Sequence, residues 1–521
     1  MAIFSRRRVV NVLRILWVLI ILWYELGSFS SSASDCNWPD SILYPVSVPI
    51  RPSHVLLVAD PQIVDRYSYP SRGAFLSYLT RVLVDLNLRK NWRVALQKRP
   101  DVVVFLGDMM DNGRSVMPEE EYEAYYRRFS DIFRIDKDIP RYFIPGNHDI
   151  GLGKSLKFSP DARHRYSAHF GYPNQEISVA NHSLILFDAP SYADEDSQRH
   201  GQRKSFEKWV PIRYGALDFM KKFSSTTFAH PFSEEKHTDP VILFSHIPLY
   251  RSDGRGCGPL REKGTLRPGV GHGYQNTLEK RSSQRLLEFF KPVAIFSGDD
   301  HDYCEYTHQL ALPRGSPQLI HEITVKTISM VMNVRRPGFQ LLSLAPADLR
   351  QDGKPTYSDT PCLLPDQLGI YLNVYIPLLA ISLLIVFASN IKQGPRPSHY
   401  KNLSNGTQIS LVSGAHADIE ETELGLYSIP PPVSIGTSSK TSRAQGWFVL
   451  QTERRGLKAE HPSLLEWFDR IKDALSSFWP GSSRLVARRR SWLWIYALDI
   501  RDVAIFPLCT FVMITWWVVA H

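Results

Sequence analysis

Three long apolar stretches constrain this chain more than any other feature, because each must be buried in a protein core or in a bilayer. They run from about Val9 to Leu26, from Leu368 to Phe387 and from Val503 to Ala520. A helix of about 20 apolar residues crosses the hydrocarbon core of a membrane. We therefore expect membrane anchors at residues 1–26, 368–389 and 503–520, with a folded region at 27–367 between the first two.

Two of these stretches have a second interpretation. The first is interrupted by Asn11, Arg14 and Glu25 and is followed by Ser- and Ala-rich sequence, which is also compatible with a cleaved signal peptide. The third contains Pro507 and is also compatible with a helix lying at the membrane surface. The sequence favours an uncleaved anchor and a third span, and both alternatives stay open.

The distribution of basic residues predicts the orientation of the chain. The residues concerned are Arg6, Arg7 and Arg8 before the first stretch, and Lys392, Arg396 and Lys401 after the second. Because Lys and Arg accumulate on the cytosolic side of spans, residues 27–367 would lie outside the cytosol and residues 390–502 inside it. The segment 390–502 begins with Ser-, Pro- and Gly-rich sequence and reads as a largely disordered loop.

Five short runs of strand length lie between the first two stretches, and three of them, at 55–59, 102–106 and 241–244, are rich in Val, Ile and Phe. They are Val55–Ala59, Val102–Leu106, Arg141–Pro145, Val241–Ser245 and Val293–Ser297. Their length and composition are typical of buried strands. Residues 73–97, between the first two runs, have apolar residues at helical spacing. Strand, helix and strand in succession predict an α/β domain.

A polar cluster follows each of these five runs. The clusters are Asp60-Pro61-Gln62, Gly107-Asp108-Met109-Met110-Asp111, Gly146-Asn147-His148-Asp149, His246 and Gly298-Asp299-Asp300-His301. Taken alone, Asp60 is more often a turn or helix cap, and His246 is more often a packed core histidine. The carboxyl ends of strands in an open α/β sheet meet in one crevice, so all five clusters together predict one site.

This order of motifs resembles the calcineurin-like metallophosphoesterase superfamily over about residues 53–310. The segments His246–Asp253, Gly273–Asn276 and Ser297–Cys304 are similar to the GPI-anchor remodelling phosphodiesterases, which include the fungal manganese-dependent cell-division-cycle phosphoesterases. The resemblance implies a four-layer αββα sandwich with its core at residues 53–345, carried by N-terminal and C-terminal transmembrane helices.

The resemblance also implies a two-metal site. Asp60, Gln62 and His301 would hold one cation, Asp108 would bridge two, and Asn147, His246 and Asp299 would complete the ligands of the second cation. Most superfamily members have His in place of Gln62 and Gly-His-x-His in place of Gly298–His301, and in this register Asp299 rather than Asp300 faces the metal. Five of these seven side chains offer oxygen and none is a thiolate, so we predict two Mn²⁺ ions.

The remaining candidates would act on the substrate. A hydroxide shared by the two ions would attack phosphorus, and His148 would protonate or stabilise the departing oxygen. Asp149 would orient that imidazole, and Asp111 would fix the loop after Asp108. Three further side chains either approach the phosphate or glycan or belong to a solvated Gly-rich loop, and the sequence leaves both readings open. They are Arg251, Arg255 and His272.

Four of the five cysteines fall in the region placed outside the cytosol, where disulfides persist. Cys36, Cys257, Cys304 and Cys362 allow three pairings, and the sequence does not choose among them. A Cys257–Cys304 bridge is one hypothesis, because both residues lie close to site motifs. Asn181-His182-Ser183 is a glycosylation acceptor, so we expect Asn181 to carry a glycan.

The resemblance implies an enzyme of the endoplasmic reticulum or Golgi membrane, with a lumenal catalytic domain, that removes ethanolamine phosphate from a mannose of the GPI glycan. Its partners would be the bilayer and GPI-anchored proteins or the GPI glycolipid. Two alternatives stay open, namely a lumenal phosphatase of proteins or small molecules and a degenerate membrane cargo receptor. Despite a net charge of +9, nucleic acid is not an expected partner, because residues 53–310 carry no clustered basic face.

Overall fold

Two β-sheets form the centre of the protein, whose computed structural model describes residues 6–43, 51–228, 239–312, 316–347, 354–393 and 492–520. The first sheet has the order β13 (Tyr357–Leu363), β12 (Gly338–Leu344), β1 (Ser53–Val58), β2 (Val102–Phe105) and β3 (Arg141–Phe143). The second has the order β10 (Cys304–Leu310), β11 (Gln318–Thr324), β9 (Ala294–Ser297), β6 (Val241–Ser245), β5 (His182–Phe187) and β4 (Gln175–Val179). A short ribbon pairs β7 (Val270–Gly271) with β8 (Tyr274–Gln275).

The side chains of β1 show how the layers pack. Leu56 and Val58 point to one face and join a core that includes residues of the covering helices, whereas Val55 and Leu57 point to the other face and pack with residues of the second sheet. This alternation follows from the two-residue period of a strand, and burial of both faces explains its unbroken apolar sequence.

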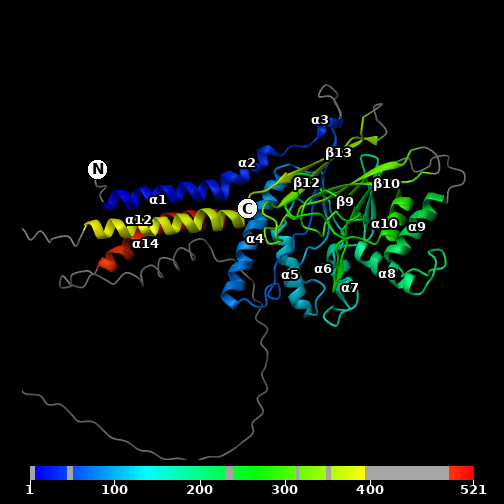
Figure 1. Cartoon of the computed structure of the whole chain (residues 1–521), viewed down its shortest axis with the longest axis horizontal. Helices are drawn as coiled ribbons and strands as arrows, with labels where there is room; N and C mark the ends of the chain where they lie inside the picture. Colours follow the sequence, from blue (N-terminus) through cyan, green and yellow to red (C-terminus); the bar gives the residue numbers. More distant parts are fainter. Residues whose placement is uncertain are drawn as a thin grey trace, which may run out of the picture. The chain divides into compact units, whose positions relative to one another are not determined.

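Helices cover the outer face of each sheet (Figure 1). The first sheet is covered by α4 (Ala74–Leu96), α5 (Glu119–Ile132) and α7 (Ala162–Phe170), and the second by α8 (Ala189–Gly201), α9 (Ala216–Phe228) and α10 (Lys280–Phe290). The short helix α6 (Asn147–Ile150) follows β3. Helix, sheet, sheet and helix form the predicted αββα sandwich, and all five predicted strands and the helix at 73–97 are present.

Parallel pairing brings the predicted clusters to one edge. β1, β2 and β3 run parallel, as do β5, β6 and β9. The loops after β1, β2, β3, β6 and β9 therefore leave the sheets at their carboxyl ends, where the sequence predicts a shared site.

Three segments are long and apolar enough to cross a membrane, namely Arg6–Leu43, Gln367–Ile391 and Trp492–Ala520. The first contains α1 (Arg6–Leu22), η1 (Trp23–Gly27), α2 (Ser28–Asp35) and α3 (Asp40–Leu43). The second contains α11 (Gln367–Ile370), η3 (Tyr371–Tyr375) and most of α12 (Ile376–Gln393), and the third is α14 (Trp492–Ala520). Figure 1 shows α1, α12 and α14 side by side, in agreement with their shared apolar cluster.

The third apolar helix begins earlier than the sequence predicts, at Trp492 rather than Val503. Its first turns carry Asp499, whose carboxylate accepts a 2.6 Å hydrogen bond from Nη2 of Arg6 on α1. Arg14 of the same helix donates to the backbone carbonyl of Asp502 at 2.8 Å. Residues 492–502, expected in the loop 390–502, therefore belong to the apolar helix and contact α1. The rest of that predicted loop, from 394 to 491, lies outside the described residues.

Two disulfides join distant segments. Cys36, just after α2, is bonded to Cys362 in β13, and Cys257, in the loop after β6, is bonded to Cys304 at the start of β10. The hypothesised Cys257–Cys304 pairing is therefore confirmed, and it ties two loops that leave the site. Cys509 is the free cysteine among the described residues.

Candidate metal centre and active site

The predicted ligands lie in strained backbone. Five of the seven have a positive φ, namely Asp60 (47°), Gln62 (37°), Asp108 (55°), Asp299 (65°) and His301 (66°). For residues other than glycine, this left-handed region costs about 1–3 kcal/mol each, and it persists only where the surrounding structure enforces it. Such a concentration at the strand ends indicates a functional site.

Two glycines make room for the ligands. A Cβ atom at Gly107, whose φ is +97°, would lie 2.3 Å from Nδ1 of His246. A Cβ atom at Gly146 would lie 2.0 Å from Oδ1 of Asp108. The Gly-Asp and Gly-Asn-His-Asp motifs therefore need glycine for close approach to a ligand as well as for the turn.

His246 lies at the centre of the acidic cluster and is fully buried. Its Nε2 is 3.1 Å from Oδ1 of Asn147, 3.4 Å from Oδ1 of Asp108 and 3.5 Å from Oδ1 of Asp299. The potential ligand atoms of Asp60, Asp108 and His246 all lie within 4.8 Å of one another. Side chains from five different strand ends therefore meet at one point.

The orientation of His246 suits a metal ligand. Its Nδ1 lies 2.7 Å from the backbone carbonyl of Leu106, which can only accept a hydrogen bond. Nδ1 therefore carries a proton, and Nε2 faces the carboxylates. Histidines that bind metals usually donate their second ring nitrogen to a carbonyl or carboxylate in this way.

The other predicted ligands adjoin this cluster. Nε2 of Gln62 donates to Oδ2 of Asp108 at 2.7 Å and lies 3.3 Å from Nε2 of His301. The backbone N–H of Asp299 donates to Oδ1 of Asp60 at 3.1 Å. Asp300 instead forms an ion pair with Arg261 at 2.5 Å. The structure thus brings all seven predicted side chains together and selects the register in which Asp299 faces the centre.

Burial and mutual contact shift the protonation of the cluster. Burial raises the pKa of Asp60 well above its ordinary value, despite the nearby His246. Burial also opposes ionisation of Asp108, but His246 and His148 outweigh it and hold the pKa of Asp108 below its usual range. Burial lowers the pKa of His301 to about 3, which keeps this imidazole neutral and able to act as a ligand.

The donor set fits divalent cations. Oδ2 of Asp60 is buried and has no hydrogen-bond donor among the residues that the structure describes. An unpaired buried carboxylate oxygen is costly unless a cation neutralises it. Oxygen donors from Asp, Asn and Gln, together with two imidazoles, match the preferences of hard and borderline divalent metals.

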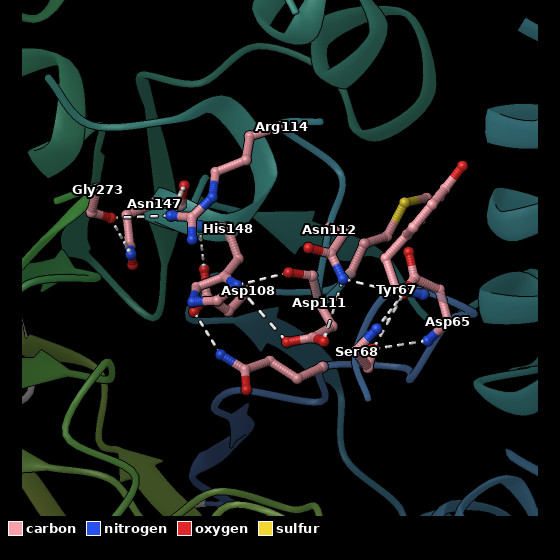
Figure 2. A network of polar contacts seen from close by, with 12 residues as sticks. Asp65, Tyr67, Ser68, Asp108, Asp111, Asn112, Arg114, Asn147, His148 and Gly273 are labelled. Carbon is pink, nitrogen blue, oxygen red and sulfur yellow. Dashed lines mark hydrogen bonds and ion pairs between the residues drawn. The ribbon is translucent and has the colours of Figure 1, made fainter. Parts of the chain in front are cut away.

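His148 lies at the edge of this cluster (Figure 2). Its backbone N–H donates to Oδ1 of Asp108 at 2.9 Å, and its side chain remains 27% exposed. Nδ1 lies 2.5 Å from the carbonyl of Asp111 and 3.6 Å from its carboxylate. Nε2 is therefore the ring nitrogen left for a ligand or substrate.

The predicted role of Asp149 is wrong. Its buried carboxylate accepts hydrogen bonds from three backbone amides, those of Met109, Met110 and Gly146. It therefore fixes the loop after β2 and caps α6, while Asp111 supports the His148 imidazole. These are the reverse of the roles that the sequence predicts for the two aspartates.

The structure contradicts both readings of Arg251, a substrate contact and a solvated loop position. This side chain is 1% exposed, and its Nη2 lies 2.9 Å from Oε2 of the fully buried Glu322. Arg255 is exposed in the same loop and donates to Oγ of Ser252 at 3.3 Å. His272 is exposed beside Gly273, whose carbonyl accepts a 2.8 Å hydrogen bond from Nδ2 of Asn147. Arg255 and His272 therefore remain available to a substrate.

Arg114 is a site residue that the sequence analysis missed. Its Nη1 donates to the carbonyl of Asn147 at 2.9 Å and to that of Gly273 at 2.8 Å, as Figure 2 shows. It joins the Asn147 loop to the loop that carries His272. The only signal for it in the sequence is its place three residues after Asp111, which identifies no partner.

Similar proteins share this region. The family model of the calcineurin-like phosphoesterases matches residues 53–303. Cell division control protein 1 of Saccharomyces cerevisiae is 35% identical over 371 residues, which cover 69% of this chain and 70% of that protein. The Metallophosphoesterase 1 homolog of Drosophila melanogaster is 24% identical, covering 67% of this chain and 85% of that protein. Metallophosphoesterase 1 of Gallus gallus is 22% identical, with coverages of 71% and 87%.

Proposed function

This chain belongs to the calcineurin-like phosphoesterase family, and we propose that it is a two-metal phosphodiesterase of the secretory pathway that removes ethanolamine phosphate from a mannose of the GPI-anchor glycan. Family membership and the buried Asp60–Asp108–His246 cluster support a metal-dependent phosphoester hydrolase. The observation that carries the proposal is the convergence of seven donor side chains on one cluster.

The donors suggest how the site would work. Asp60, Gln62 and His301 would hold one cation, Asn147, His246 and Asp299 the other, and Asp108 would contact both. Two divalent cations supply an activated water and neutralise charge on the phosphate oxygens. We propose manganese, because five of the seven donors are oxygen atoms.

His148 is the proposed general acid. The proton on Nδ1 is held by the carbonyl of Asp111, so a protonated Nε2 would donate to the departing oxygen. The Asp111 carboxylate, 3.6 Å from Nδ1, would help to orient the imidazole. Partial exposure of His148 leaves a path for the substrate.

Three features support the GPI substrate and the lumenal placement. The segments His246–Asp253, Gly273–Asn276 and Ser297–Cys304 resemble the GPI-anchor remodelling enzymes. Three membrane-length helices would hold the enzyme on the bilayer that carries lipid-anchored substrates, which raises their effective concentration. Two disulfides and the exposed acceptor Asn181 fit an oxidising lumen of the endoplasmic reticulum or Golgi.

A paired variant test addresses the reaction. In cells that lack the native protein, we expect His148→Ala to be produced and folded but to leave ethanolamine phosphate on the GPI glycan, as read by mass spectrometry. His169→Ala, on α7 and bonded to Glu123 at 2.9 Å, is the matched control and should restore trimming. Normal trimming by His148→Ala would refute the assignment.

Purified protein tests the metal and the ester class. After chelation, manganese should restore hydrolysis of bis(4-nitrophenyl) phosphate. Recovery with zinc but not manganese would overturn the metal proposal. Hydrolysis of 4-nitrophenyl phosphate, with none of the diester, would favour a lumenal phosphatase instead.

A further inference from the structure

One face of α4 continues from the apolar helices onto the surface of the catalytic domain. Side chains three or four residues apart share a face of a helix. On α4 this face is formed by Phe75, Leu79, Leu83, Leu86, Lys90 and Arg93, with Leu76 beside it.

The C-terminal half of this face packs on the apolar helices. Leu83 lines an apolar cavity of about 510 Å³ together with Trp17, Tyr375 and Phe511. Leu86 packs against the cluster formed by residues of α1 and α14. These contacts place α4 at the boundary between the catalytic domain and the apolar helices α1, α12 and α14.

Polar contacts fix the same half of α4. Nζ of Lys90 lies 2.6 Å from Oε2 of Glu25, and both side chains are buried. The guanidinium of Arg93 lies 3.9 Å from the ring centroid of Trp517 and donates to its backbone carbonyl at 3.1 Å. Figure 1 shows α4 beside the ends of α12 and α14 and crossing their direction.

The N-terminal half of the face is uncovered. Phe75 is 78% exposed, Leu76 50% and Leu79 39%, and the adjacent Tyr78 is 59% exposed. Leu83 is the first residue of this face that contacts the apolar helices. At a rise of 1.5 Å per residue, Phe75 lies about 12 Å from Leu83 along α4. Four neighbouring exposed apolar or aromatic side chains mark an interaction surface.

We propose that Phe75, Leu76, Tyr78 and Leu79 dock into the bilayer leaflet that adjoins the catalytic domain. Continuity favours lipid over a second copy or another protein, because the same helix face already contacts three segments of membrane-spanning length. Tyrosine suits the interface, since its ring is apolar and its hydroxyl reaches water.

The segment between β1 and α4 links this docking surface to the active site. The segment between β1 and α4 carries Asp65, whose Oδ1 accepts a hydrogen bond from Nδ2 of Asn112 at 2.9 Å. The backbone amides of Tyr67 and Ser68 donate to the same oxygen (Figure 2). Asn112 in turn adjoins Asp111, which supports His148. Docking of α4 would therefore hold the site at a fixed height and tilt above the leaflet, a consequence that rests on the proposed function.

Lipid quenching tests the docking without reference to catalysis. In the full chain with Cys509→Ser, Leu76→Cys would carry an NBD label in nanodiscs containing shallow spin-labelled phosphatidylcholine. Val210→Cys, 84% exposed before α9, is the matched control. We expect quenching and a blue-shifted emission at position 76 and neither at position 210. The proposal would be overturned if the labels at positions 76 and 210 gave equal, unquenched emission. It would also be overturned if self-association of the protein shielded position 76 from the lipid quencher.

Activity tests the consequence for the site. The triple variant Phe75→Ser/Leu76→Ser/Leu79→Ser should keep full activity on soluble bis(4-nitrophenyl) phosphate. It should cleave a nitrophenyl phosphodiester anchored by a dialkylglycerol in the same nanodisc about tenfold more slowly, because orientation to the substrate is lost. Equal rates on the anchored ester would refute the positioning role. Failure of the native enzyme on both diesters would refute the proposed function and leave the quenching result standing.

Discussion

Replacing Arg251 by methionine should lower the free energy of unfolding of the protein without raising the KM for its substrate. The guanidinium is 1% exposed and lies 2.9 Å from the fully buried Glu322 carboxylate. That carboxylate also accepts from the Ser297 hydroxyl at 2.8 Å and the Leu249 amide at 3.0 Å, and it lies 2.6 Å from Nε2 of His308. Removing one partner of a buried ion pair costs about 3–5 kcal/mol, because the other charge stays uncompensated.

The melting temperature reports this loss. Since 1 kcal/mol shifts Tm by about 2–4 °C in domains of 150–250 residues and less in larger ones, we expect a fall of roughly 5–10 °C. The assay is thermal unfolding of the detergent-solubilised chain, followed by steady-state kinetics at 25 °C. KM and kcat should stay within about twofold of the native values, since no transition-state contact is removed.

Two variants make the test specific. Arg255→Met, at an exposed position in the same loop, should change stability by no more than about 0.5 kcal/mol. Arg251→Met combined with Glu322→Gln should lose less than the sum of the two single variants, because neutral glutamine leaves no buried charge. An Arg251→Met protein with native Tm and a raised KM would refute the structural role.

Three further predictions concern the site and its support. Gly146→Ala should weaken metal affinity by about 10–100-fold, as measured by titration, because its Cβ would meet Oδ1 of Asp108 at 2.0 Å. Asp111→Asn should lower kcat about tenfold or more at unchanged metal content, because His148 loses its carboxylate neighbour. Burial opposes ionisation of Glu322, but Arg251 and His308 hold its pKa below the usual value, so the stability it contributes should be complete above about pH 4.3 and be lost as the pH falls below it.

Each of these has a contrary outcome. Native metal affinity in Gly146→Ala would mean that the loop adapts freely. An unchanged kcat in Asp111→Asn would remove that residue from the mechanism. If Glu322→Gln and the native protein lost stability in parallel between pH 5 and pH 3, the stabilised carboxylate would lie elsewhere.

Short-range signals in the sequence predicted the fold and the metal cluster well. The five predicted runs coincide with β1, β2, β3, β6 and β9, and four of them are apolar because a strand buried on both faces needs such a sequence, whereas β3 is partly exposed. The polar clusters converge because parallel strands place their carboxyl ends together, a rule that needs no knowledge of side-chain contacts.

Long-range contacts explain the errors. Arg251 looks like a loop cation until β11 places Glu322 beside it, and the sequence separates these residues widely. Asp149 adjoins His148 in the chain, yet the first turn of α6 directs it to the amides of Gly146 and the loop after β2. The contact of the first turns of α14 with Arg6 likewise joins residues that lie 493 positions apart.

The proposed reaction requires that side chains from five strand ends bind two neighbouring cations. Crystals of the full chain soaked in manganese chloride test it through anomalous scattering at the manganese edge. We expect two peaks about 3.5–4 Å apart, both within coordination distance of Asp108 and flanked by the remaining six donors. A single surface peak, or no peak within coordination distance of Asp60, Asp108 and His246, would contradict it.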